Sequence, residues 1–193
     1  MDASDPLSGT PDLAALPPDL PVPEDDGAAG HLVGKAWPTG LVLRSTDGVP
    51  LDFSKLPGRA VIYVFPMMGR PGMPLPDGWD EVPGARGCTV QSLAYSKNVA
   101  DLEAAGVAAY GMSNQTLEEL EEAMERLGLQ QTLLSDSEGV ARHALRLPTF
   151  SVDDLVYLRR LTMALVDGVI EKVWYPVFPP GRDVDEVREW NQL

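Results

Sequence analysis

Cys88 is the only cysteine among the 193 residues, and it is the side chain best suited to covalent chemistry. It follows the glycine-containing segment 83–87 and begins a stretch whose apolar residues recur at helical spacing. Free backbone N–H groups and the positive dipole end at a helix start favour the thiolate, which is the nucleophilic form of cysteine. Arg86 adds a cation if its side chain turns inward. The position predicts a reactive thiol, and the alternative is a buried, inert cysteine.

The histidines do not indicate a second reactive centre. His31 and His143 are far apart, and neither has a Cys, His or carboxylate at ligand spacing, so we expect no metal and no cofactor. A Cys–His hydrolase requires one of them to converge on Cys88, and the spacing does not support this. A thioredoxin-type dithiol is excluded because there is no second cysteine.

Two adjacent arginines, Arg159 and Arg160, interrupt the apolar stretch 156–163, which we expect to form a buried strand. Side chains alternate along a strand, so one arginine is predicted to face each side of the sheet. One of them could point into the site and stabilise a thiolate. The alternative is that both extend to the surface or pair with carboxylates there.

A buried strand is expected directly before the Cys88 region. Residues 60–65 form a continuous apolar run rich in β-branched and aromatic side chains, and the run ends at Pro66. Residues 66–87 are rich in proline and glycine and are predicted to be an irregular loop, and long loops of this kind are often functional. Residues 88–105 are predicted to be a helix.

The remaining pattern is that of an α/β fold. It predicts a hairpin over 41–53, a strand at 107–112, a helix capped by Asn114 or Thr116 and ending at Gly128, a short helix at 138–145, strands at 155–166 and 169–177, and a helix at 183–190. We therefore expect a mixed central sheet with flanking helices, in which parallel crossovers come first and an antiparallel hairpin comes last.

Residues 1–27 differ in composition from the rest of the chain. They hold six prolines and seven acidic residues but no lysine or arginine. Such a segment cannot bury enough apolar surface to offset its ordering entropy, so we predict a disordered acidic arm over 1–27 and a folded domain over 28–193.

The net charge and the N-terminal sequence indicate which partners and which cellular compartment to expect. The net charge of −14 offers no basic patch for nucleic acid and no attraction to anionic lipid. No segment resembles a signal peptide or a membrane span, and a lone cysteine suits a reducing compartment. We expect a cytoplasmic protein with neither nucleic-acid nor membrane partners.

From about residue 31 the chain resembles the peroxiredoxins, specifically the branch related to bacterioferritin comigratory protein. The matching stretches are 58–66, Gly87-Cys88-Thr89, 133–136, and Arg160-Leu161-Thr162 followed by Asp167-Gly168. They occur in the family's order, and together they are more specific than any one alone. The resemblance implies a thioredoxin-like fold with an N-terminal hairpin.

The resemblance also implies roles for five residues. Cys88 is the peroxidatic cysteine, which attacks the O–O bond of a hydroperoxide. Pro66 ends the central strand, Arg160 stabilises the thiolate and the peroxide oxygens, and Gln91 helps to hold that arginine. The family's loop usually carries a Ser or Thr that orients the peroxide. No Ser, Thr or Tyr occurs between Pro66 and Cys88, so Thr89 is the candidate to compensate.

A second departure concerns turnover. Members of this branch often carry a resolving cysteine five residues after the first, and here that position is Leu93. The sulfenic acid at Cys88 must therefore be reduced by an external thiol or a thioredoxin-type reductant. The resemblance further implies a monomer. One alternative is a peroxide sensor or partner-binding protein with little turnover, and another is a binding module with an inert cysteine.

Overall fold

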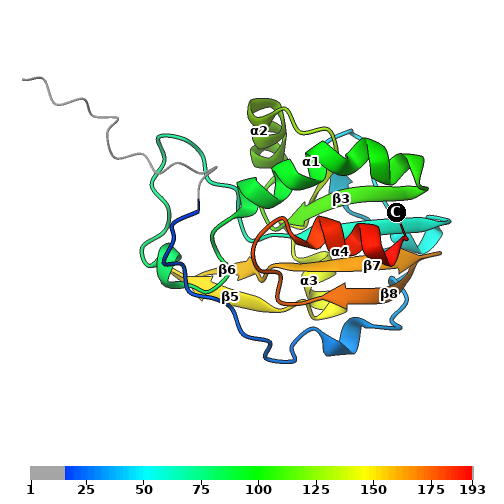
Figure 1. The fold of residues 1–193 in the computed structure, drawn as a ribbon, viewed down its shortest axis with the longest axis horizontal. Helices are drawn as coiled ribbons and strands as arrows, with labels where there is room; N and C mark the ends of the chain where they lie inside the picture. Colours follow the sequence, from blue (N-terminus) through cyan, green and yellow to red (C-terminus); the bar gives the residue numbers. More distant parts are fainter. Residues whose placement is uncertain (1–15, 193) are drawn as a thin grey trace, which may run out of the picture.

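A computed structural model of the protein describes residues 16–192 (Figure 1). Its central sheet has six strands in the order β1-β4-β3-β2-β7-β8. The strands span Arg44–Ser45 (β1), Arg59–Val64 (β2), Val107–Ser113 (β3), Thr132–Ser135 (β4), Leu161–Val166 (β7) and Val169–Trp174 (β8). Strands β2, β3 and β4 run parallel, while β1, β7 and β8 pair antiparallel to their neighbours. The predicted α/β fold with a mixed sheet is confirmed.

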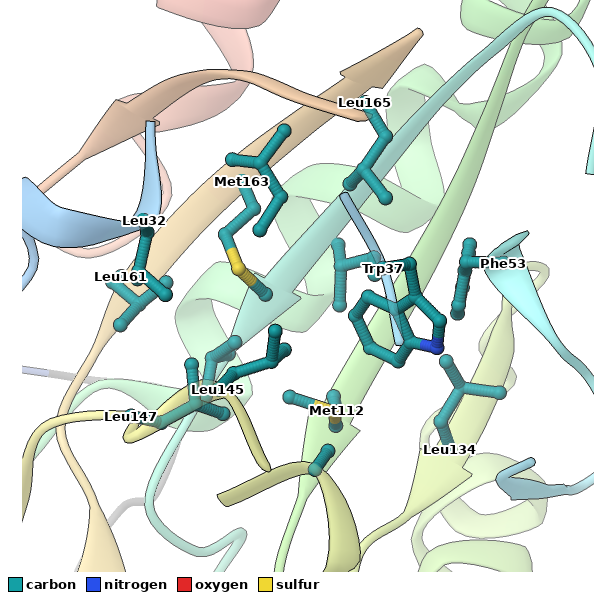
Figure 2. Close-up of a cluster of buried hydrophobic side chains, with 14 of the residues drawn as sticks. Leu32, Trp37, Phe53, Met112, Leu134, Leu145, Leu147, Leu161, Met163 and Leu165 are labelled. Carbon is teal, nitrogen blue, oxygen red and sulfur yellow. The ribbon is translucent and has the colours of Figure 1, made fainter. Parts of the chain in front are cut away.

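Strand β2 is the centre of the sheet because its side chains are apolar on both faces. Ile62 and Val64 point into one core, and Tyr63 and Phe65 point into the other. This alternation follows from the period of two along a strand. Figure 2 shows the first core, where Trp37 and Phe53 pack against leucines and methionines from β3, β4, β7 and α3.

Four α-helices within residues 16–192 cover the two faces of the sheet. They span Cys88–Ala104 (α1), Leu117–Leu127 (α2), Val140–Leu145 (α3) and Asp183–Trp190 (α4). Side chains of α1, α2 and α4 share the core that contains Tyr63, whereas α3 packs into the opposite core. Helix α2 begins with a capping box, in which Thr116 accepts from the Glu119 N–H and Glu119 accepts from the Thr116 N–H, and it ends at left-handed Gly128.

The N-terminal hairpin is smaller than predicted. Leu43 and Leu51 form one bridge through two mutual hydrogen bonds of 2.9 Å, and strand β1 pairs instead with β4. The four-residue strand β4 is absent from the predicted element order because a run this short carries little periodicity. It supplies the edge to which β1 is added.

The predicted strand over 155–166 is wrong in its middle. It divides into β6, Leu155–Leu158, and β7, Leu161–Val166, with Arg159 and Arg160 between them. Strand β6 pairs with β5, Thr149–Val152, in a separate two-stranded sheet. The prediction that the arginines face opposite sides of one strand therefore fails. Because Arg160 lies outside both strands, its guanidinium can donate to carbonyls of the loop before Cys88.

The loop between β2 and α1 is irregular, as predicted, apart from one 3-10 turn at Trp79–Glu81. Trp79 and Ala85 pack against Val152 and Tyr157 of the β5–β6 hairpin, which anchors the loop. In Figure 1 the loop and this hairpin lie at the same end of the molecule.

The proposed arm lies partly outside the described residues, since the structure begins at residue 16. Residues 16–27 contain neither helix nor strand. Asp26 accepts a hydrogen bond of 2.9 Å from the Tyr175 hydroxyl, and Pro23 lies against Gly84. The division at residue 27 stays a prediction. Among the described residues, no helix is long and apolar enough to span a membrane.

Candidate active site

Cys88 is the first residue of α1, and its side chain is buried, with the residue only 3% exposed. The preceding residue, Gly87, has a φ of 102°, and a β-carbon there would overlap Pro180. Both observations require glycine at this position. The loop therefore enters the helix in a conformation that favours glycine, and the thiol of the next residue points into the protein.

Arg160 reaches the sulfur. Its Nη2 lies 3.2 Å from Cys88 Sγ and also donates to the carbonyls of Gly84, Ala85 and Arg86 at 3.0 to 3.3 Å. Arg160 is 3% exposed, so water screens this cation little. A buried positive charge therefore lies directly beside the sulfur.

Gln91 holds the other side of the guanidinium. Its Oε1 accepts from Arg160 Nη1 at 2.5 Å, and its Nε2 donates to Asp183 Oδ2 at 2.8 Å. The same Asp183 oxygen accepts from Tyr95 Oη at 3.0 Å and from Thr162 Oγ1 at 2.6 Å. Asp183 is 1% exposed and begins α4. A chain of hydrogen bonds thus joins α4, α1 and β7 to the sulfur.

Two stacked tyrosines support this network. The rings of Tyr63 and Tyr95 lie 4.2 Å apart, and Gln131 Nε2 donates to the Tyr63 hydroxyl at 2.6 Å. Burial raises the pKa of both phenols well above the ordinary value. They remain neutral at physiological pH, so Tyr95 is available as a donor to Asp183.

A small cavity of about 20 Å³ adjoins the thiol. It is lined by Met67, Gly69, Leu75, Trp79, Ala85, Arg86, Gly87, Cys88 and Thr89. Thr89 lines the same cavity as Cys88, and its role in place of a loop hydroxyl stays a prediction. Pro66 is buried at the end of β2 but is not among the lining residues, and its carbonyl accepts from Ser113 Oγ at 2.9 Å.

Other candidate residues have different partners. Arg86 lines the small cavity, but its guanidinium pairs with Asp80 through Nε at 2.5 Å, and the cation that contacts the sulfur is Arg160. Arg159 lies over the ring of Phe150 at 5.9 Å. The ring of His31 bonds to the Leu145 carbonyl at 2.9 Å, which occupies it away from Cys88.

Sequence reasoning missed Asp183, Tyr95 and Thr162. Asp183 was recognised as the start of a helix but had no predicted role. A signal was present in Thr162, which belongs to the matching stretch Arg160-Leu161-Thr162. No local pattern links Asp183 to Gln91, because 92 residues separate them.

The mixed sheet, with a buried cysteine beginning α1, has the thioredoxin-like fold of the peroxiredoxins. Peroxiredoxin Q of Xylella fastidiosa, in a cysteine-to-serine mutant, superposes with a TM-score of 0.66 at 15% identity, over 83% of this chain and 95% of that one. Peroxidoxin BcpB of Mycobacterium tuberculosis gives 0.65 at 16% identity, over 83% and 96%. Xanthomonas campestris bacterioferritin comigratory protein gives 0.60 at 18% identity, over 79% and 90%. The sequence matches no protein-family model and no curated protein.

Proposed function

We propose that the protein is a thiol-dependent peroxidase that reduces hydroperoxides through Cys88. The observation that carries the proposal is the buried guanidinium of Arg160, with Nη2 3.2 Å from Cys88 Sγ, beside a cavity that admits a small group. The fold shared with peroxiredoxin Q and peroxidoxin BcpB supports the same reaction.

In the first step the Cys88 thiolate attacks the terminal oxygen of the hydroperoxide. The S–O bond forms as the O–O bond breaks, and the alkoxide or hydroxide that leaves takes a proton from solvent. The sulfur is oxidised to sulfenic acid, and the peroxide is reduced to an alcohol or water. Arg160 and the free N–H groups at the start of α1 face the negative charge that develops on the oxygens.

The remaining steps need a thiol from outside the chain, because Cys88 is the only cysteine. One thiol condenses with the sulfenic acid to give a mixed disulfide and water. A second thiol attacks that disulfide, which releases Cys88 and an external disulfide. Atoms and electrons balance with two thiols consumed for each peroxide.

The other site residues act around these groups. Gln91 orients Arg160, and Pro66 ends β2 so that the loop can turn back towards α1. Thr89 lines the small cavity and is proposed to contact the peroxide in place of a loop hydroxyl. We further propose that the protein works as a monomer in the cytoplasm, where thiols are kept reduced.

The test is intact-mass analysis after one equivalent of hydrogen peroxide, with dimedone present to trap a sulfenic acid. We expect one dimedone adduct in the native protein and none in Cys88→Ser. A Cys88 that stays a free thiol would rule out the proposal. Light scattering at working concentration checks the monomer.

The second candidate function is a peroxide sensor with little turnover. It is favoured by the burial of Cys88, which impedes attack by a bulky reductant on the oxidised sulfur. Steady-state consumption of peroxide with dithiothreitol separates the two functions. A peroxidase consumes many equivalents of peroxide, whereas a sensor oxidises once and stalls.

A further inference from the structure

A second, larger cavity of about 750 Å³ lies beside the site. Its walls are the loop after β2, the first turns of α2 and the tip of the β5–β6 hairpin. This volume lies within the range of cavities that bind small molecules. Gln115 fixes one wall through two hydrogen bonds to the Met68 backbone, and Arg126 donates to the Gly69 carbonyl at 3.2 Å.

The two cavities adjoin each other. Met67, Gly69 and Leu75 line both of them, so these residues lie between the space beside Cys88 and the larger space. The small cavity, of about 20 Å³, has room for a group about the size of one water molecule. Only the reacting end of a molecule fits beside the sulfur, and the larger space nearest to it lies on the side of Met67 and Leu75.

The larger cavity combines apolar walls with acidic groups. Its apolar residues are Met67, Met68, Met73, Pro74, Leu75, Pro76 and Leu155. Its carboxylates are Asp77, Glu118, Glu119, Glu122 and Asp153. Arg70 is the one cationic side chain among the lining residues, and it pairs with Glu122 at 3.6 Å. The cavity therefore suits an apolar body and repels a carboxylate.

We propose that this cavity binds the organic part of a hydroperoxide and selects by charge, accepting uncharged or cationic groups and disfavouring anionic ones. The inference rests on the proposed peroxidase function. The occupant is the peroxide because the cavity adjoins the space beside Cys88 and Arg160, and a peroxide reacts with the reduced form of this sulfur. A thiol reductant meets the oxidised sulfur instead.

The experiment compares two probes that differ by one carboxylate, cumene hydroperoxide and its 4-carboxy derivative. Loss of the free Cys88 thiol is followed by quenched flow and intact mass, and each rate is divided by the rate of the same peroxide with free cysteine. We expect the uncharged probe to react about tenfold faster at low ionic strength. The ratio should fall towards one in 1 M salt.

A double variant tests whether the cavity causes the selectivity. Glu118→Gln with Asp153→Asn removes two of the lining carboxylates, and we expect the ratio to fall to about threefold. The control, Glu121→Gln with Glu125→Gln, removes two charges from α2 outside this cavity and should leave the ratio unchanged. The rate with hydrogen peroxide should be the same in the control variant as in the native protein.

The outcomes separate the two proposals. If no peroxide oxidises Cys88, the peroxidase function fails. If hydrogen peroxide reacts but the two cumyl probes react equally, or the double variant keeps the full ratio, the inference alone is overturned. It is also overturned if the double variant alters only the later reduction step, measured with cysteamine against mercaptopropionate, since the cavity would then serve the thiol.

Discussion

At the scale of single residues, the site depends on one buried cation. Arg160 donates through Nη1 and Nη2 to Gln91, to Cys88 and to three loop carbonyls. The neighbouring Arg159 instead lies over Phe150 and donates to the Thr149 carbonyl. The two adjacent arginines thus make different contacts, so a substitution of Arg159 is a matched control for the same substitution of Arg160.

Arg160→Met should slow the oxidation of Cys88 by hydrogen peroxide by about 10²- to 10³-fold, the usual loss when one charge-stabilising donor is removed. Methionine fills the site without leaving a buried charge. Stopped-flow kinetics measures the rate, and urea unfolding checks that the variant is folded. Arg159→Met should change the rate less than twofold, and equal losses in both variants would contradict the assignment.

Asp183 is expected to act through Gln91. Asp183→Ala leaves three buried donors without an acceptor and should lower the free energy of unfolding by about 3 kcal/mol or more. Asp183→Asn keeps an acceptor oxygen, so it should fold and slow the oxidation of Cys88 by less than tenfold. The combination of Asp183→Asn with Gln91→Met should be no slower than Gln91→Met alone. Additive losses would show that Asp183 acts independently of Gln91.

At the scale of elements, the turn after β1 ties two strands together. Asp47 accepts from the Ser45 hydroxyl at 2.5 Å, from the Val49 N–H at 2.9 Å and from the Thr132 hydroxyl at 3.2 Å. These hydrogen bonds, chiefly that from Ser45, lower the pKa of Asp47 below 3.8 although burial opposes the change. The carboxylate therefore binds β1 and β4 most firmly when it is ionised.

This lowered pKa predicts a pH dependence. The pKa is lower in the folded than in the unfolded protein, so the contribution is fully present above the ordinary value of 3.8 and is lost as pH falls through the lowered one. At pH 7, Asp47→Asn should be less stable than the native protein by at most about 1 kcal/mol. Urea unfolding should show this difference shrinking towards pH 3. A difference that stays constant, or one equal to that of exposed Asp101→Asn, would contradict the prediction.

How well an element could be predicted depends on how local its determinants are. The apolar run of β2 and the junction at Cys88 are local, and both elements were predicted within one residue. Strand β4 is too short to show a period of apolar residues. The strand expected near Leu43 in a hairpin pairs with β4 instead. Arg160 leaves the strand because of partners on another loop, and those partners follow from the fold. Arg86 pairs with Asp80, a contact that follows from the conformation of the loop.

At the scale of the whole molecule, the loop that leads to Cys88 is contacted by segments near both ends of the described chain. Leu16 lies 3.2 Å from where a β-carbon on Gly87 would be, and Pro23 lies against Gly84. From the other direction, Pro180 packs on Gly87 and Asp183 holds Gln91. The reactive geometry thus depends on contacts between segments far apart in sequence.

These contacts join residues that are far apart in sequence. Contacts of this kind form late in folding because each one closes a long loop of chain. Rapid reaction with peroxide should accordingly be the last property regained on refolding, after helical circular dichroism has recovered. In a urea titration it should vanish no later than the tryptophan signal of global unfolding. Fast oxidation that persists in the unfolded chain would show that the thiol needs no such assembly. If the prediction holds, Cys88 is a chemical probe of the complete tertiary structure.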